Sequence, residues 1–567
     1  ASAAFYAPQE DGIRSLAAAC FKAFEQGTDE MDEYELANAS RLLRSAGMKK
    51  EYEQLTDSSE YTSALEKLAK AYAYDRQHDR AAELYLEYAR IFKEKCENSG
   101  DPDQAHEAVW GNIYACDALV DMLDYTAAEV AANAALEIAE KFAKKYPDDP
   151  QMQRDLSVSY NNLGDIAEAQ NDYKAAEGYY AKDLAISERL AEKYPDDPKM
   201  QRDLSVSDNK LGNIAKARND YKAAEGYYAK ALEIGKRLAK KYPDDPGMQS
   251  DLSVQYGNLG DIAKARNDYK AAEEYYAKAL EIGERLAEKY PDDPNLQRDL
   301  SVSYGNLGDI AKALYDYRAA EGYYAKALEI RERLAEKYPD DPQMQRDLSV
   351  SYDNLGDIVK ARNDYRAAEG YYAKALEIFE KLAEKYPEDP QMQRDLSVSY
   401  GRLGDIAKSR NDYKAAEGYY AKALEISKRL AKMFPEVPML KDDLAVSLFR
   451  CGTCSADGKL SSEQKALLRD ATAIWEELYK QTGYELYAER REIAQNRLNQ
   501  CSEQGGKNME QKKPRFFARL REKIRAYREM RKLVRMLKIM EKTDRKLTKA
   551  IEEAGELIQS GETDDEE

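Results

Sequence analysis

Residues 195–242 read PDDPKMQRDLSVSDNKLGNIAKARNDYKAAEGYYAKALEIGKRLAKKY, and this stretch decides the fold. Close copies of it follow one another without a gap from residue 147 to residue 434. Tyr-Pro pairs recur every 48 residues from Tyr146 onward, and Phe434-Pro435 continues the series. A fixed period of this length is typical of an array in which each unit buries its apolar face against the next.

Each repeat predicts two helices joined by a short turn. Asp149 is a suitable N-cap and Pro150 a suitable first residue for a helix that runs from residue 150 to about 170. Asn171-Asp172 breaks this helix, and a second one runs from 173 to about 193. The second helix must end before the next Tyr-Pro pair, because proline disfavours the helical conformation of the preceding residue. Two such helices form an antiparallel hairpin, and hairpins stack to bury their remaining apolar surface.

A small-residue and aromatic pattern recurs at fixed offsets within these hairpins. Its copies include Tyr256, Leu259, Gly260, Ala272, Tyr276 and Ala279; Tyr304, Leu307, Gly308, Ala320, Tyr324 and Ala327; and Tyr352, Leu355, Gly356, Ala368, Tyr372 and Ala375. The pattern resembles the tetratricopeptide repeat family, and YKAAEGYYAKALEI resembles the long repeats of kinesin light chains and their bacterial relatives. The family unit is usually about 34 residues rather than 48. Two repeats depart locally, with Asp183 in place of the last alanine and Asp208 in place of the first tyrosine.

The resemblance implies an all-α fold, a right-handed α-solenoid of stacked hairpins that binds other proteins. The predicted organisation is a helical cap at 1–55, two divergent repeats at 56–146, six near-identical repeats at 147–434, a degenerate repeat and closing helix at 435–503, a linker at 504–513, a basic amphipathic helix at 514–551 and an acidic disordered tail at 552–567. Atypical end units are expected, because they shield the last apolar faces of a solenoid.

Charge and composition restrict the function classes. The net charge of −19 disfavours nucleic-acid binding by the body of the chain. Six cysteines in 567 residues do not make a disulfide scaffold, and no run of about 18 apolar residues predicts a membrane span. A reducing, cytoplasmic location is therefore expected. The first residue is Ala1, which leaves open whether a further domain lies upstream.

In the resembled family, one face of each first helix lines a concave groove that holds a partner segment. The corresponding candidate residues here are Asn162, Asp165, Glu168, Asn258, Asp261, Lys264, Asn306, Asp309, Lys312, Asn354, Asp357, Lys360, Arg402, Asp405 and Lys408. A recurring valine adds an apolar row at Val206, Val254, Val302, Val350 and Val398. The alternative is a solvated face on which the valines pack between neighbouring first helices.

Residues 512–549 carry 16 basic side chains against four acidic ones. The candidate docking residues are Arg515, Arg519, Arg521, Lys523, Arg525, Arg528, Arg531, Lys532, Arg535 and Lys538. A stripe of apolar residues along the same helix favours a packed protein contact, with another protein or with the chain's own groove. Nucleic acid and anionic membrane are the alternatives, and both would act through 512–549 alone.

Features that suggest catalysis have simpler explanations. Cys451 and Cys454 resemble half of a zinc or redox site, but both replace core residues of a first helix, where free cysteine packs well. His78 is predicted in a turn and His106 before a helix, and neither is expected to be catalytic. The Asp-Asp pairs of the turns act as helix caps rather than as calcium ligands. We expect no enzyme activity, cofactor, metal or small-molecule substrate.

These observations favour a non-enzymatic scaffold or adaptor that binds an unidentified protein in its groove and has the basic helix as a second docking element. Two other classes stay open. One is a nucleic-acid accessory protein that acts through 512–549. The other is a regulatory or sensor subunit of a larger enzyme complex.

Overall fold

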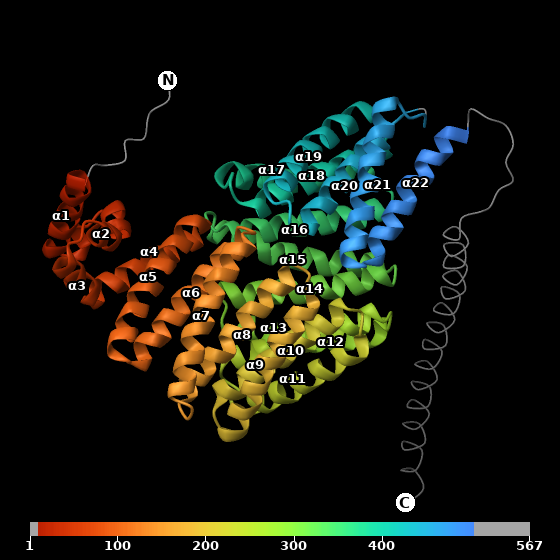
Figure 1. Ribbon diagram of the computed structural model, residues 1–567. Helices are drawn as coiled ribbons and strands as arrows, with labels where there is room; N and C mark the ends of the chain where they lie inside the picture. Colours follow the sequence, from red (N-terminus) through yellow and green to blue (C-terminus); the bar gives the residue numbers. More distant parts are fainter. Residues whose placement is uncertain (1–9, 457, 504–567) are drawn as a thin grey trace, which may run out of the picture. The chain divides into compact units, whose positions relative to one another are not determined.

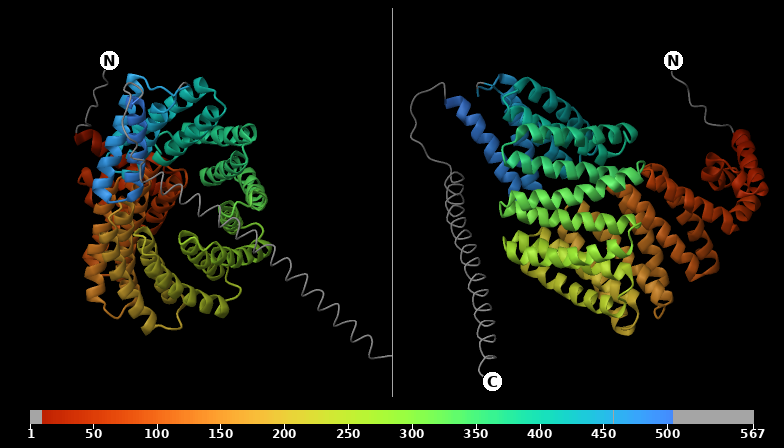
Figure 2. Two further views of the ribbon diagram at one scale, coloured as in Figure 1. Left: turned by 90° about the vertical axis from the view of Figure 1, so that its right-hand side faces the viewer. Right: turned by 180° about the vertical axis from the view of Figure 1, so that it is seen from behind.

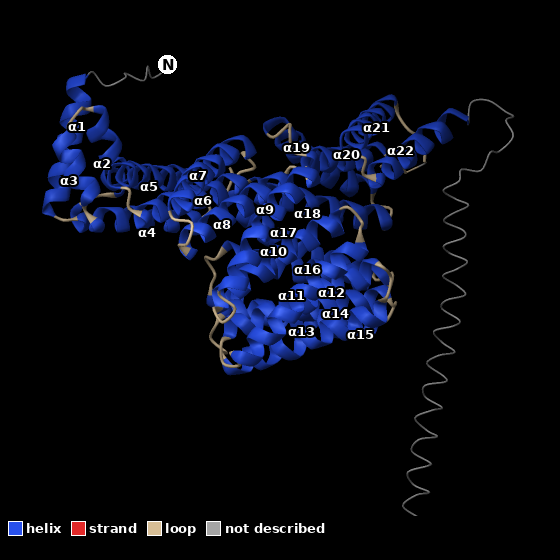
Figure 3. Cartoon of the chain, turned by 60° about the horizontal axis from the view of Figure 1, so that its bottom comes forward, coloured by secondary structure: helices blue, strands red, loops and turns tan. Residues whose placement is uncertain are grey.

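The computed structural model describes residues 10–456 and 458–503, and all regular structure within these ranges is helical (Figures 1 and 3). The predicted linker, basic helix and acidic tail at 504–567 lie outside the described residues. The helices are α1 (Glu10–Gln26), η1 (Thr28–Glu30), α2 (Glu33–Ser45), α3 (Lys49–Asp57), α4 (Ser59–Tyr74), α5 (His78–Ser99), α6 (Pro102–Asp121), α7 (Tyr125–Lys145), α8 (Pro150–Ala169), α9 (Tyr173–Lys193), α10 (Pro198–Ala217), α11 (Tyr221–Lys241), α12 (Pro246–Ala265), α13 (Tyr269–Lys289), α14 (Pro294–Ala313), α15 (Tyr317–Lys337), α16 (Pro342–Ala361), α17 (Tyr365–Lys385), α18 (Pro390–Ser409), α19 (Tyr413–Met433), α20 (Pro438–Gly452), α21 (Ser462–Thr482) and α22 (Glu485–Glu503).

Each hairpin is defined by its caps. In the first close copy, the Asp149 carboxylate accepts hydrogen bonds from the backbone N–H groups of the first turn of α8, which starts at Pro150. Asn171, with φ +61°, ends the helix, and the Asp172 N–H donates to the carbonyl oxygen of Ala167 (2.8 Å). Asp172 in turn caps α9. Asparagine tolerates the left-handed conformation better than most residues, so the chain can reverse within a few residues.

The two helices of a hairpin are held together by a glycine and a tyrosine. In α12 and α13, a Cβ atom added to Gly260 would lie 2.6 Å from Cε1 of Tyr276, so only glycine allows this approach. The Tyr276 side chain is 1% exposed and its hydroxyl donates to Asp261 (2.5 Å). The same arrangement recurs in the other close copies at Tyr180, Tyr228, Tyr324, Tyr372 and Tyr420.

Successive hairpins stack into a curved array (Figure 2). The second helix of each repeat packs on the first helix of the next, as α9 does on α10 and α11 on α12. Two pairs of neighbouring first helices also contact each other, α6 with α8 and α12 with α14, and no pair of neighbouring second helices in the described residues packs as closely as these. The array therefore curves with its first helices on the inner surface.

The array turns back on itself within residues 10–498. The connection between α4 and α5 reaches the connection between α17 and α18, where Arg76 pairs with Asp389 and the Tyr386 hydroxyl donates to Asp75 (3.4 Å). Arg76 and Asp389 are 313 residues apart, which is about six and a half repeats. Tyr74 adds a contact one repeat earlier, donating to Asp341 (3.3 Å). We call these contacts of Tyr74, Asp75 and Arg76 the seam.

Both ends of the array have packed helices. Near the N-terminus, Ala17 and Cys20 of α1 belong to the same apolar cluster as Leu43 of α2 and Leu55 of α3. Near the other end, Trp475 of α21 is 2% exposed and its indole N–H donates to Asp442 (2.7 Å). None of the helices in the described ranges has the length and apolar character of a membrane span.

Candidate binding groove

The inner surface of the array is formed by the side of each first helix that faces away from the second helices. Its most regular feature is the valine row that the sequence indicated. Val206, Val254, Val302 and Val350 are 42%, 54%, 41% and 36% exposed, while Val398 is half-buried. These side chains are not buried between neighbouring first helices, so they form an accessible apolar row with one member per repeat.

Aspartates alternate with cations along the same surface. Lys216 donates to Asp261 (2.6 Å), Lys264 to Asp309 (2.7 Å) and Lys312 to Asp357 (3.1 Å), each pair joining two neighbouring repeats. We name this series the groove ladder, and its carboxylates are Asp165, Asp261, Asp309, Asp357 and Asp405. At three rungs the cation comes from the following repeat: Lys210 at Asp165, Arg402 at Asp357 and Arg450 at Asp405.

Each ladder carboxylate is also fixed from behind by a tyrosine of the second helix. The hydroxyls of Tyr276, Tyr324 and Tyr372 donate to Asp261, Asp309 and Asp357 at 2.5–2.6 Å. Burial, together with the adjacent carboxylate, raises the pKa of these tyrosines, so they stay protonated donors. In the second close copy, Asn213 takes the place of the aspartate and accepts from Tyr228 (2.6 Å).

Asp357 shows the electrostatic balance of the ladder. Burial by itself would raise the pKa of Asp357, but the Tyr372 hydrogen bond and the charges of Arg402 and Lys312 outweigh burial and lower the pKa. Asp357 is therefore ionised. All five ladder carboxylates are paired with a cation within the array rather than free.

Most of the other predicted groove residues are engaged within the chain. Asn162 is buried, not groove-facing as the helical arc suggested, because its amide donates to Asp117 of α6 (3.3 Å). Glu168 accepts from Tyr180 (2.9 Å), Asn258 donates to Asn209 (3.2 Å), and Lys408 donates to the carbonyl oxygen of Thr453 (2.9 Å).

Three predicted residues differ from this group. The side chains of Asn306, Asn354 and Lys360 are half-buried and have no polar partner within the described part of the chain. They lie on α14 and α16, alongside Val302 and Val350. The accessible part of the inner surface therefore combines the valine row with these polar groups. The predicted docking residues Arg515, Arg519, Arg521, Lys523, Arg525, Arg528, Arg531, Lys532, Arg535 and Lys538 lie outside the described residues.

A second line of ion pairs was missed by sequence reasoning. Arg154 pairs with Asp203 (2.5 Å) and Arg394 with Asp443 (2.5 Å), and equivalent pairs at Arg202, Arg298 and Arg346 join the N-terminal ends of neighbouring first helices. The signal was present in the sequence as an Arg and an Asp separated by 49 residues, but its meaning depends on the stacking.

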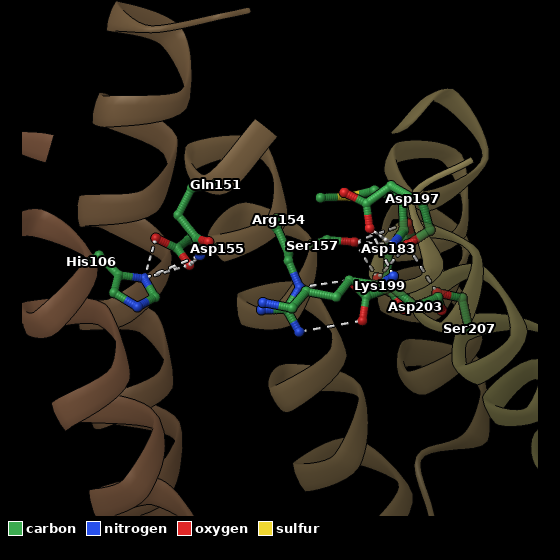
Figure 4. A network of polar contacts seen from close by, with 12 residues as sticks. His106, Gln151, Arg154, Asp155, Ser157, Asp183, Asp197, Lys199, Asp203 and Ser207 are labelled. Carbon is green, nitrogen blue, oxygen red and sulfur yellow. Dashed lines mark hydrogen bonds and ion pairs between the residues drawn. The ribbon is translucent and has the colours of Figure 1, made fainter. Parts of the chain in front are cut away.

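The histidines and cysteines have structural surroundings. His78 is the first residue of α5 rather than a turn residue, and His106 lies inside α6, because Asp101 caps that helix and Pro102 starts it. His106 contacts Asp155 at 2.9 Å, and this hydrogen bond raises the pKa of His106 (Figure 4). Cys454 is buried beyond the end of α20, in a cluster with Ala407 and Tyr420, and Cys451 is half-buried against the same cluster.

Family models of the tetratricopeptide repeat match residues 299–381 and, with a second model, residues 156–199, 209–247, 254–295 and 397–432. The chain is a tetratricopeptide repeat protein. The matched segments of this tetratricopeptide repeat protein begin within α8 and end within α19, so all of them lie in the six close copies. No curated protein matches the chain.

Solved structures with some likeness include BtubC (BKLC) from P. vanneervenii, at 25% identity over 46% of this chain and 92% of that one, with a TM-score of 0.37. A Rap protein complexed with competence and sporulation factor is 14% identical over 70% and 98%, with a TM-score of 0.37. A signal transduction ATPase with a tetratricopeptide repeat sensor, from Pyrococcus horikoshii, is 16% identical over 86% and 65%, with a TM-score of 0.38. These TM-scores are too low for the binding behaviour of those proteins to bear on this chain.

Proposed function

We propose that this tetratricopeptide repeat protein is a non-enzymatic interaction scaffold that holds a segment of a partner protein against the inner surface of its array. The observation that carries the proposal is the accessible valine row. Burial of an apolar side chain of this size away from water is favourable, so contact with a partner at these valines would stabilise the complex. A regular row with one member per repeat suits a ligand that runs along the array and contacts several repeats in turn.

The groove ladder sets the polarity of this surface. Its carboxylates are paired with Lys or Arg and hydrogen-bonded to tyrosine, so the inner face offers less free negative charge than its sequence suggests. None of these carboxylates stands ready as a general base, which supports a binding role rather than catalysis. Partner recognition would then depend on Val302, Val350, Asn306 and Asn354 rather than on the acids.

Neighbouring packed helices lie about 10 Å apart. A polyproline II segment has three residues per turn and rises about 3.1 Å per residue. A segment in this conformation that follows the valine row would therefore present an apolar side chain to the groove about once every three residues. Its backbone amides could bond the side chains of Asn306 and Asn354. This describes a protein ligand by its chemistry, and many different proteins could carry such a segment.

The test is affinity capture from the native cell with the full chain. The groove variant carries Val302→Ser, Asn306→Ala, Val350→Ser and Asn354→Ala. We expect at least tenfold weaker capture of the partner that binds the wild type, equivalent to about 1.4 kcal/mol, with unchanged helical circular dichroism. The matched control carries Glu281→Ala and Glu329→Ala on exposed outer positions of α13 and α15 and should bind normally. Undiminished capture by the groove variant would count against the proposal.

A second candidate rests on the basic segment at 512–549. Its excess of 12 positive charges could bind nucleic acid or an acidic protein. Removal of residues 512–567 distinguishes this function from groove binding. Nucleic-acid binding that falls steeply with salt and disappears on truncation would establish it, and equal binding by the truncated chain would exclude it.

A further inference from the structure

A small cavity of about 160 Å³ lies between α8, α9 and α10. Val158 and Asn161 of α8 and Val206 of α10 stand at its inner-surface side, where Val206 is 42% exposed. Asp183 and Ser187 of α9 line its deep side and are 4% and 1% exposed. The cavity therefore passes between two first helices and ends on the second helix behind them.

Asp183 places a buried carboxylate in this cavity. Its oxygens accept hydrogen bonds from the Ser157 hydroxyl and from the Asn161 amide (3.3 Å). No cation contacts Asp183 in the described ranges. The nearest arginine of the lining, Arg154, is paired with Asp203 (2.5 Å), as Figure 4 shows. A buried carboxylate without a counter-ion lowers stability, so this residue needs an explanation.

The other close copies have alanine at this position, at Ala231, Ala279, Ala327, Ala375 and Ala423. The corresponding spaces also differ in how the chain fills them. Gln255 lies against Gly235 and donates to Ser205 (2.7 Å), both of which belong to the preceding repeat. Phe379, 3% exposed, occupies the equivalent of Ser187 near the end of the array. The Asp183 cavity is thus a local departure rather than a general property of the repeat.

One of these filled spaces shows what group fits. Arg331 of α15 stands three repeats after Ser187 and is 8% exposed. Its guanidinium donates to Ser301 (2.9 Å) and Ser351 (3.0 Å), which are the equivalents of Ser157 and Ser207. The backbone geometry of this repeat therefore accepts a guanidinium between two serine hydroxyls. In that copy Ala327 stands at the position of Asp183, so that position supplies no carboxylate to the guanidinium.

The Asp183 cavity has the complementary composition. Ser187 is short where Arg331 is long, so the space is open, and Asp183 supplies a carboxylate at the position that Ala327 occupies in the Arg331 copy. An engineered cavity of about 150 Å³ holds a planar molecule of the size of benzene. A guanidinium is planar and presents several donors, which suit a carboxylate and hydroxyl oxygens.

We propose that this cavity binds a guanidinium ion, supplied by an arginine side chain of the segment that lies in the groove. The source of the guanidinium rests on the proposed function, whereas the cavity's preference for guanidinium does not. Val158 and Val206 would contact the aliphatic part of the arginine, and Asp183 would pair with its head. The pocket then fixes one position of the bound segment along the array.

The first experiment uses n-butylguanidinium as probe and n-butylurea as its neutral counterpart, with binding to the full chain measured by calorimetry. We expect n-butylguanidinium to bind at least tenfold more tightly than n-butylurea. Asp183→Ala restores the residue of the sister repeats and should abolish this difference. Ser187→Arg places a guanidinium inside the cavity and should also block the probe. Equal binding of the two probes, or unchanged binding to Asp183→Ala, would overturn the proposal.

The thermal stability of the Asp183→Ala variant shows whether a loss of probe binding comes from loss of the binding group or from damage to the fold. Asp183→Ala removes the unpaired buried charge, so its thermal midpoint should be equal to or higher than that of the wild type while probe binding is lost. A lower midpoint would assign Asp183 a structural role and count against the pocket.

The source of the guanidinium is tested with the blocked peptide acetyl-Ala-Ala-Arg-Ala-Ala-amide and its Gln counterpart. Preference for the Arg peptide that is lost in Asp183→Ala supports an arginine side chain. Binding of n-butylguanidinium without that preference overturns the peptide source and leaves a free guanidinium compound. The probe should still bind the groove variant at Asn306 and Asn354, so failure of the proposed groove function and failure of this pocket are distinguishable.

Discussion

Asp208 stands where five sister repeats carry tyrosine. In four of them the tyrosine hydroxyl donates to a glutamate 20 residues earlier, for example Tyr304 to Glu284 (2.6 Å). Asp208 is 2% exposed and its Oδ1 has no hydrogen-bond partner in the structure. Burial raises the pKa of Asp208 to about 6.

Asp208→Tyr should therefore raise the free energy of unfolding by about 1–2 kcal/mol, through burial of the ring and a hydrogen bond to Glu188. In the wild type the folded state binds the Asp208 proton more tightly than the unfolded state. Its contribution is thus fully present below pH about 4 and is lost as the pH rises through about 6. Urea unfolding at pH 4 and pH 7 should show a smaller pH dependence in the variant. An unchanged pH dependence would contradict the assignment to Asp208.

Tyr315 is a second residue that departs from its copies. It has φ +61°, where five sister turns have asparagine. Because asparagine adopts this conformation at lower cost, Tyr315→Asn should raise the free energy of unfolding by about 0.5–1 kcal/mol. The reciprocal change, Asn363→Tyr, should lower it by a similar amount. Thermal unfolding of both variants measures the pair, and a decrease on Tyr315→Asn would show that other contacts of the tyrosine dominate.

The helix hairpin is the next scale, and α12 contains its own matched pair of glycines. Gly260 packs on the Tyr276 ring, whereas a Cβ at Gly257 would have no neighbour within 4 Å. Gly260→Ala should therefore lower the free energy of unfolding by about 1–3 kcal/mol through overpacking. Gly257→Ala should raise it by about 0.5–1 kcal/mol through helix propensity. Chemical denaturation of both variants tests the prediction, and similar effects of the two would contradict close packing at Gly260.

The hairpins could be predicted from the sequence to within a residue or two. The cap at Asp149, the break at Asn171 and the proline after Tyr194 fix both helices locally. The interaction partners of the groove residues could not be predicted in this way. The sequence predicts Asp309 as a partner-binding residue, but in the structure Lys264 and Tyr324 donate to it. Lys264 and Asp309 are 45 residues apart and become neighbours only after the repeats stack. The binding roles of Asn306, Asn354 and Lys360 stay predictions.

At the scale of residues 10–498, the seam could not be foreseen. A small rotation from each hairpin to the next decides where the array returns upon itself, and the 48-residue period alone does not encode that rotation. The seam also buries a charged contact, since the Asp389 side chain is fully covered and Arg76 is largely covered. Removal of one partner would leave the other buried and unpaired.

Arg76→Glu should open the seam, because it places two carboxylates together. We expect a larger maximum dimension in small-angle X-ray scattering, with unchanged helical circular dichroism. Lys67→Glu makes the same charge change at an exposed position of α4 and should leave the scattering unchanged. An identical profile for Arg76→Glu would mean that the contacts of Tyr74 and Asp75 suffice.

The seam has a consequence for inheritance. Near-identical copies invite unequal recombination, which removes or adds whole units of 48 residues. Loss of one unit would bring Val437, not Asp389, opposite Arg76, whereas gain of one unit would bring a cap like Asp341 into that place. Shortening would therefore leave an arginine without its acid, and lengthening would not. Natural variants of this chain should show extra units more often than missing ones.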